Sequence, residues 1–92
     1  MKYFDWSDEK NELLKKERGV SFEQVELAIA SGDLLDRVKH PNPAKYPNQN
    51  VFLVRIDDYV YSVPYVEDDE NIFLKTIIPN GRATNKYLGG KK

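Results

Sequence analysis

The chain has 92 residues, 40% of them hydrophobic and 12% aromatic, and its 14 Lys plus Arg almost balance its 15 Asp plus Glu. This length suits one small domain, and a net charge of -1 excludes an acidic disordered tail and a uniformly basic nucleic-acid coat. The absence of cysteine excludes disulfides, thiolate zinc sites and a cysteine nucleophile.

The N-terminal residues predict an aromatic segment followed by a helix. Residues 3–6 (Tyr-Phe-Asp-Trp) are expected to form a strand or an anchor that places two rings in the core. Ser7 is a candidate N-cap for the helix that follows, and Glu12 and Lys16 form a favourable i, i+4 pair within it. We expect Gly19 to end this helix, because glycine tolerates a positive φ.

A second helix has the clearest local signals in the chain. Ser21 and Gln24 have the spacing of a capping box, and apolar side chains recur at helical spacing after them. Gly32 is a stop signal. Together these features predict a helix over residues 22–31.

From Asp33 onward the apolar period changes from 3.6 to 2, which indicates strands. The expected strands are residues 34–38, 51–56, 59–66 and 72–78, and residues 81–88 are expected to form a short helix. A loop with three prolines follows the first strand. The other three strands form an antiparallel meander. The predicted fold is α+β, with two N-terminal helices on a mainly antiparallel sheet of about four strands and a short C-terminal helix.

The predicted turn at residues 57–58 assigns side chains to the two faces of the sheet. A two-residue turn there pairs Val54 with Tyr61 and makes one face rich in tyrosine. Continuation across a five-residue acidic loop adds further residues to this face, namely Phe73, Lys75 and Ile77. The opposite, aliphatic face is expected to carry the helices, and it holds Val51, Leu53, Val60, Val66, Ile72, Leu74 and Ile78.

The charges are polarised along the chain. Residues 57–70 contain six acids and no base, and the bases that follow are Lys75, Arg82, Lys86, Lys91 and Lys92. A cationic C-terminal patch beside the rings of Tyr61 and Tyr65 is a pattern that suits phosphodiester binding. The alternative is that the tyrosines pack in the core and the terminal lysines only aid solubility.

His40 is the only histidine, and its loop is weakly basic because Lys39, Lys45 and Tyr46 lie near it in sequence. It is a candidate general acid or base, and the alternative is a solvated surface residue. The acidic run of residues 67–70 lacks the spaced ligands and the glycine of a calcium loop, so a solvated hairpin turn is the favoured interpretation. Arg55 alternates with apolar residues and is expected to form a structural ion pair.

Two stretches of the sequence resemble the BrnT family of type II toxin-antitoxin toxins, whose fold is related to RelE-like ribonucleases. The first is Phe-Asp-Trp at residues 4–6 with Lys10, followed by Arg-Gly-Val-Ser-Phe-Glu at residues 18–23. The second is Ile-Ile at residues 77–78 with Arg-Ala-Thr at residues 82–84. These stretches span nearly the whole chain.

The resemblance implies a cytoplasmic bacterial or archaeal toxin that cleaves or blocks RNA in translation and is neutralised by a ribbon-helix-helix antitoxin encoded beside it. RelE-like cleavage uses the 2′-hydroxyl of the RNA as nucleophile and needs neither metal nor cofactor. The expected catalytic residues are Lys75, Arg82, Tyr61 and His40, and the expected RNA-binding residues are Lys86, Tyr65, Lys39 and Lys45. The alternative is a non-catalytic protein-interaction or RNA-binding domain of the same fold, which is a diverged toxin without activity.

The N-terminus also bears on where the protein acts. Acids occupy residues 5, 8, 9 and 12, where a signal peptide needs an apolar run, and the longest aliphatic or aromatic run is residues 51–54. We therefore expect residues 1–92 to be a single domain without a membrane segment or membrane partner.

Overall fold

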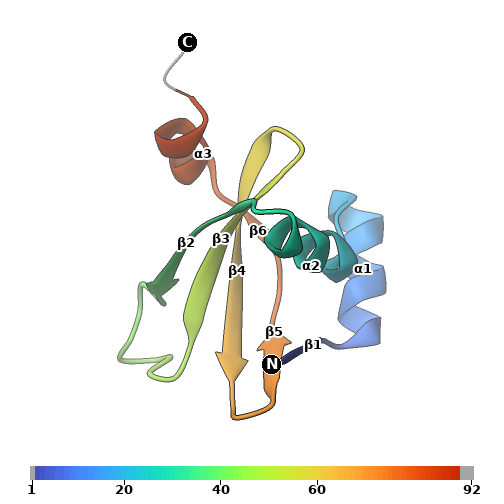
Figure 1. Cartoon of the computed structure of the whole chain (residues 1–92), viewed down its shortest axis with the longest axis vertical. Helices are drawn as coiled ribbons and strands as arrows, with labels where there is room; N and C mark the ends of the chain where they lie inside the picture. The colour runs from blue at the N-terminus through green and yellow to red at the C-terminus, as the bar shows by residue number, and fades with distance from the viewer. Residues whose placement is uncertain (1, 90–92) are drawn as a thin grey trace.

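A computed structural model describes residues 2–89 and is α+β, with three helices and a mixed sheet (Figure 1). The helices are α1 (Asp8–Arg18), α2 (Phe22–Ala30) and α3 (Gly81–Tyr87). The strands are β1 (Tyr3–Asp5), β2 (Leu34–Lys39), β3 (Asn50–Ile56), β4 (Tyr59–Glu67), β5 (Asn71–Leu74) and β6 (Ile78–Pro79). All three predicted helices and the α+β class are confirmed.

The sheet contains more strands than the predicted four. Its order is β1-β5-β4-β3-β2, and β6 also pairs with β4. The N-terminal segment is a strand that pairs in parallel with β5, whereas all the other pairs are antiparallel. The strand predicted over residues 72–78 is therefore divided into β5 and β6.

Pro64 explains where β5 ends. Lys75 donates its backbone N–H to the Pro64 carbonyl over 2.8 Å, but Pro64 has no N–H with which to complete the pair. The hydrogen-bond ladder between β4 and β5 stops at this single hydrogen bond. Residues 75–77 therefore lie outside the sheet, and the chain pairs with β4 again at β6. The sequence prediction treated Pro64 as an ordinary strand residue and missed this break.

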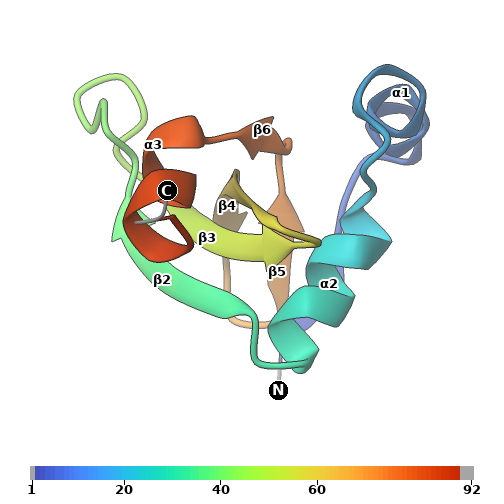
Figure 2. The same cartoon turned by 90° about the horizontal axis from the view of Figure 1, so that it is seen from above.

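The two faces of the sheet carry different helices (Figure 2). The pairing of β3 with β4 is as predicted, with Val54 opposite Tyr61 and Phe52 opposite Val63. The expectation that the aliphatic face carries the N-terminal helices is wrong, because α1 and α2 pack on the tyrosine-rich face. The core on that side comprises Leu14, Val20, Phe22, Val25, Ala28, Phe52, Val54, Ile56, Val63, Tyr65, Leu74 and Ile77.

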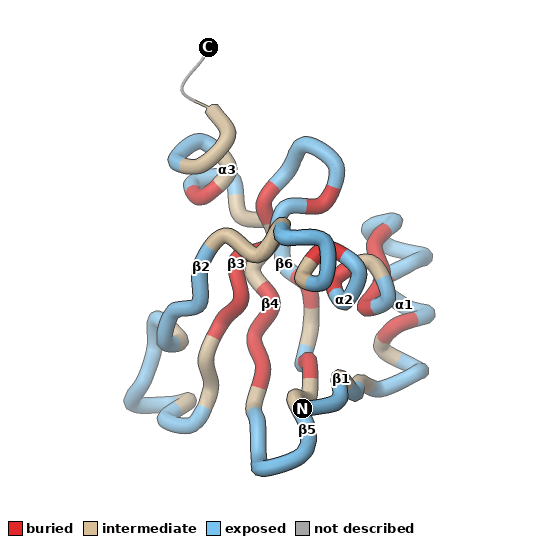
Figure 3. Tube along the Cα trace, viewed as in Figure 1, coloured by how far each residue is buried: buried red, intermediate tan, exposed pale blue. Residues whose placement is uncertain are grey.

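The aliphatic face is covered only in part, by α3. Its smaller cluster joins Val51, Leu53 and Val60 of the sheet to Ala83 of α3. In the burial view the central parts of β3 and β4 are buried, while most of β2 and the loop after it are exposed (Figure 3). Part of this face is therefore left open to solvent.

The predicted register of β5 is wrong by one residue. The turn after β4 is tighter than a five-residue loop, and Leu74 rather than Phe73 lies opposite Tyr65. Ile72 and Leu74 therefore face α1 and α2, and Phe73 and Lys75 take the opposite face. Ile77 still reaches the main core, because the chain has left the strand before it.

The predicted helix signals are confirmed. Ser7 accepts the backbone N–H of Lys10, and Gly19 ends α1 with φ of 70°. Both hydrogen bonds of the capping box between Ser21 and Gln24 are present. The predicted partner of Glu12 differs, because the ion pair forms with Lys15 at 3.1 Å rather than with Lys16.

A buried asparagine joins the two N-terminal helices. Asn11 is 3% exposed; its Oδ1 accepts the backbone N–H of Phe22 over 2.8 Å, and its Nδ2 donates to Glu23 over 2.8 Å. Trp6 stacks on Phe22 with ring centroids 5.6 Å apart. One amide side chain thus satisfies a buried N–H at the start of α2 and sets how the helices meet.

We predict that Asn11→Ala lowers the free energy of unfolding by about 2–3 kcal/mol, because the buried N–H of Phe22 loses its acceptor. Chemical denaturation measures the change. Lys16→Ala on the exposed face of α1 is the matched control and should change the free energy by less than about 0.5 kcal/mol. Equal stability of the two variants would contradict the assigned role of Asn11.

The same contact predicts a pH effect. The hydrogen bond from Asn11 lowers the pKa of Glu23 below its usual value. A carboxyl with a lowered pKa in the folded state contributes stability above its unfolded pKa, and this contribution is lost as the pH falls through the folded pKa. In an NMR titration, Asn11→Ala should raise the pKa of Glu23 towards the usual value, and an unchanged pKa would refute the assignment.

Candidate functional site

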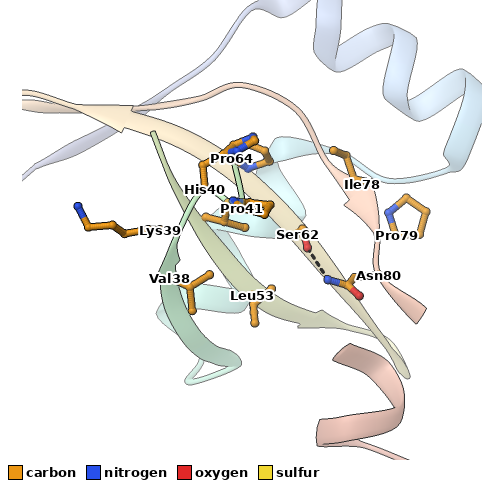
Figure 4. Close-up of a pocket in the computed structure, with 11 residues that line it drawn as sticks. Val38, Lys39, His40, Pro41, Leu53, Ser62, Pro64, Ile78, Pro79 and Asn80 are labelled. Carbon is orange, nitrogen blue, oxygen red and sulfur yellow. Dashed lines mark hydrogen bonds between the residues drawn. The ribbon is translucent and has the colours of Figure 1, made fainter. Parts of the chain in front are cut away.

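The open part of the aliphatic face forms a groove of about 440 Å³ (Figure 4). Its lining includes Val38 of β2, Val51 and Leu53 of β3, and Ser62 and Pro64 of β4. The remaining wall is formed by Ile78, Pro79 and Asn80 on one side and by residues 39–41 on the other. A volume of this size lies in the range of about 300–1,000 Å³ that is typical of ligand sites.

A second cavity of about 190 Å³ adjoins this groove beside α3. It shares Val38, Leu53 and Asn80 with the groove, and its lining includes Arg82 and Lys86. We call the two cavities together the sheet groove. The sheet groove therefore has His40 near one end and two predicted cations, Arg82 and Lys86, near the other.

Polar contacts with β4 hold α3 beside the sheet groove. Asn80 caps the helix by accepting the backbone N–H of Ala83, and its Nδ2 donates to Ser62 Oγ over 2.8 Å. Thr84 Oγ1 accepts the backbone N–H of Val60 over 2.9 Å. The Arg-Ala-Thr stretch thus uses Ala83 and Thr84 for docking and leaves Arg82 exposed.

Lys75 lies on the side of the sheet groove and not among the tyrosines, where the sequence prediction had placed it. Its Nζ lies 5.5 Å from the ring centroid of Phe73, which pairs with Val66 on the aliphatic face. Its backbone N–H binds Pro64, which lines the groove. The corrected register therefore puts Lys75 on the same face of the sheet as Arg82 and Lys86.

His40 is half-buried at the end of β2, where it organises the following loop. Its Nδ1 accepts the backbone N–H of Asn42 over 3.0 Å, and its ring packs on Tyr46 with centroids 4.4 Å apart. An Nδ1 that accepts a hydrogen bond leaves the ring hydrogen of a neutral imidazole on Nε2. His40 is therefore a candidate hydrogen-bond donor rather than a base in this arrangement.

The other two basic candidates differ in their relation to the sheet groove. Lys39 lies in the groove wall beside His40, but its side chain extends away from the groove (Figure 4). Lys45 is exposed in the loop, with Nζ 5.4 Å from the ring centroid of Tyr46. Neither lysine lines the smaller cavity that holds Arg82 and Lys86.

The two tyrosine candidates lie on the opposite face. Tyr65 is 1% exposed and stacks on Phe52 with ring centroids 3.9 Å apart, and burial raises the pKa of its hydroxyl. Tyr61 is half-buried against Tyr59 and the main core. The ring of Tyr65 thus presents no face to an RNA base, and neither tyrosine lies beside Lys75.

Two further expectations from the sequence are confirmed. Arg55 forms an ion pair with Asp33 at 4.0 Å and keeps access to solvent. Residues 68–71 form an exposed turn in which the Asp68 carboxylate accepts the N–H groups of Glu70 and Asn71. These hydrogen bonds lower the pKa of Asp68.

Sequence reasoning missed the residues that shape the sheet groove. Ser62 and Asn80 were not singled out, and Thr84 entered only as part of the Arg-Ala-Thr stretch. Asn80 immediately precedes a predicted helix and has the chemistry of an N-cap. The hydrogen bond from the Tyr87 hydroxyl to Asp36 joins the end of α3 to β2 over 3.2 Å, and burial and this bond raise the pKa of Tyr87. Only the tertiary structure brings these residues together.

We predict that Asn80→Ala loosens α3, because the helix loses both its N-cap and its bond to Ser62. The expected loss is about 1–2 kcal/mol for these contacts. Hydrogen exchange should become faster at the amides of α3, whereas exchange in α2 stays unchanged. Asn48→Ala in the exposed loop is the control, and equal exchange in both variants would contradict this role.

No helix within residues 2–89 has the length and apolar character needed to cross a membrane. In the same part of the chain, His, Asp and Glu side chains form no group of three that could hold a metal ion. Comparisons with protein-family models, with curated proteins and with solved structures each gave no match.

Proposed function

We propose that this chain is the toxin of a type II toxin-antitoxin system, with a RelE-like fold, and that it cleaves RNA without a metal ion at the sheet groove. The observation that carries the proposal is the shared face of Lys75, Arg82 and Lys86. Lys75 follows β5, whose register puts this residue on the groove side of the sheet, and Arg82 and Lys86 both belong to α3 and line the smaller cavity. The sequence resemblance to the BrnT family supports the same function.

The chemistry needs an oriented RNA chain and fixed positive charge. The 2′-hydroxyl oxygen attacks the adjacent phosphorus, the bond to the 5′-oxygen breaks, and a 2′,3′-cyclic phosphate and a 5′-hydroxyl result. Solvent accepts the 2′-hydroxyl proton and supplies one to the leaving oxygen. Lys75 and Arg82 stabilise the charge on the pentacovalent phosphate, Lys86 holds the backbone, and His40 donates a hydrogen bond from Nε2.

The structure modifies the roles expected from the sequence. Tyr61 and Tyr65 have no part in this proposal, because they lie under the N-terminal helices. Lys45 lies outside the groove, and the side chain of Lys39 extends away from it, so both contribute long-range attraction of the RNA. The stretch resembling the BrnT helix start serves packing, since Ser21 caps α2, Phe22 meets Trp6 and Glu23 binds Asn11.

A second candidate function is a non-catalytic domain that binds a protein or RNA. The aliphatic floor of the sheet groove favours it, because such a floor suits apolar side chains. The proposed partner of the toxin is an antitoxin of the ribbon-helix-helix type, encoded in the adjacent reading frame. A complex with that product that forms without any RNA cleavage would favour the second function.

The experiment is incubation of the purified chain with single-stranded RNA in EDTA, together with growth after induction in cells. We expect cleavage and growth arrest, with a roughly 10²-fold lower rate for Arg82→Ala and about 10-fold lower rates for Lys75→Ala and His40→Gln. Lys16→Ala on the opposite side of the molecule is the charge-matched control. Absence of cleavage and of growth arrest in the parent chain would refute the toxin proposal.

A further inference from the structure

We propose that the sheet groove is the docking site for an extended, acidic segment of a protein partner, which places aliphatic side chains on the groove floor and a carboxylate beside Arg82 and Lys86. The segment and RNA would then compete for the same cations. This competition rests on the proposed function, whereas the docking itself does not.

The floor of the groove has the chemistry of a site for aliphatic side chains. Val38 is 37% and Ile78 43% exposed, although both are large hydrophobic residues beside an open cavity. No Phe, Tyr or Trp of the described chain lines the larger cavity. RNA bases bind best on aromatic surfaces, so this floor fits an aliphatic side chain better than a base.

The groove also has hydrogen-bond donors that suit a peptide backbone. Ser62 Oγ accepts a hydrogen bond from Asn80 Nδ2, so the hydroxyl hydrogen of Ser62 is left to donate. Asn80 Nδ2 retains a second hydrogen, and no contact within residues 2–89 uses either one. Two donors above an apolar floor match the backbone carbonyl of a peptide residue whose side chain points into the groove.

The charge at the α3 end selects an acidic segment. Arg82 and Lys86 line the smaller cavity, and neither forms an ion pair within the described residues. The one carboxylate in that cavity, Asp36, accepts the hydroxyl hydrogen of Tyr87. Arg82 and Lys86, two cations without an ion pair in the described part of the chain, lie next to an aliphatic floor. They complement a segment in which an Asp or Glu follows or precedes aliphatic residues.

The test is selection from a random peptide library displayed on phage, with the full chain as bait. We expect the enriched peptides to combine aliphatic residues with Asp or Glu. Their affinity should fall at least about 10-fold with Val38→Asp and with Arg82→Ala, since each removes one half of the complementarity. Leu27→Asp, at a more exposed leucine on α2, and Lys16→Ala are the matched controls and should keep full affinity.

Thermal unfolding of each variant separates loss of binding from loss of folding. If Val38→Asp fails to fold, Val38→Ser replaces it. Enrichment of basic or aromatic peptides, no enrichment, or peptides that bind Val38→Asp and Leu27→Asp equally would overturn the docking proposal. An enriched acidic peptide should also inhibit RNA cleavage. Peptide binding by a chain that cleaves no RNA would refute the proposed function alone. RNA cleavage without peptide binding would refute the docking proposal alone.

Discussion

The pairing of β3 with β4 is the constraint on which the rest of the structure depends. The turn at Asp57, with φ of 57°, sets Val54 opposite Tyr61 and therefore decides which side chains share a face. A shift by one residue would exchange the two faces of a strand. One face then carries α1 and α2, and the other carries α3 and the sheet groove.

The tyrosine-rich face forms the larger of the two cores, and two buried rings belong to it. Tyr65 stacks on Phe52, and the shorter aliphatic side chains of the other face are covered by a single short helix. Large rings remove more apolar surface from water than valines do, so the longer pair of helices packs on them. What remains uncovered is the aliphatic floor, and this difference between the faces leaves a groove on one side only.

The elements of the fold were predictable where local chemistry decides them. Ser7, Gly19 and the Ser21 capping box act within a few residues, and their signals were correct. The register of β5 was not predictable, because it depends on how the acidic turn closes, and Asp68 tightens that turn by accepting two backbone N–H groups. The end of β5 depends on Pro64, which is ten residues before Leu74 and acts only across the sheet.

For the candidate site, the sequence by itself determined the inventory: one histidine, no cysteine, and bases gathered after residue 74 behind an acidic stretch. Composition and spacing along the chain are enough to establish these facts. The tertiary structure alone decided that Lys75 lies on the same face of the sheet as Arg82 and Lys86 and that Tyr65 lies in the core. Which face a strand residue occupies depends on pairing with a distant strand, and a difference of one residue reverses it.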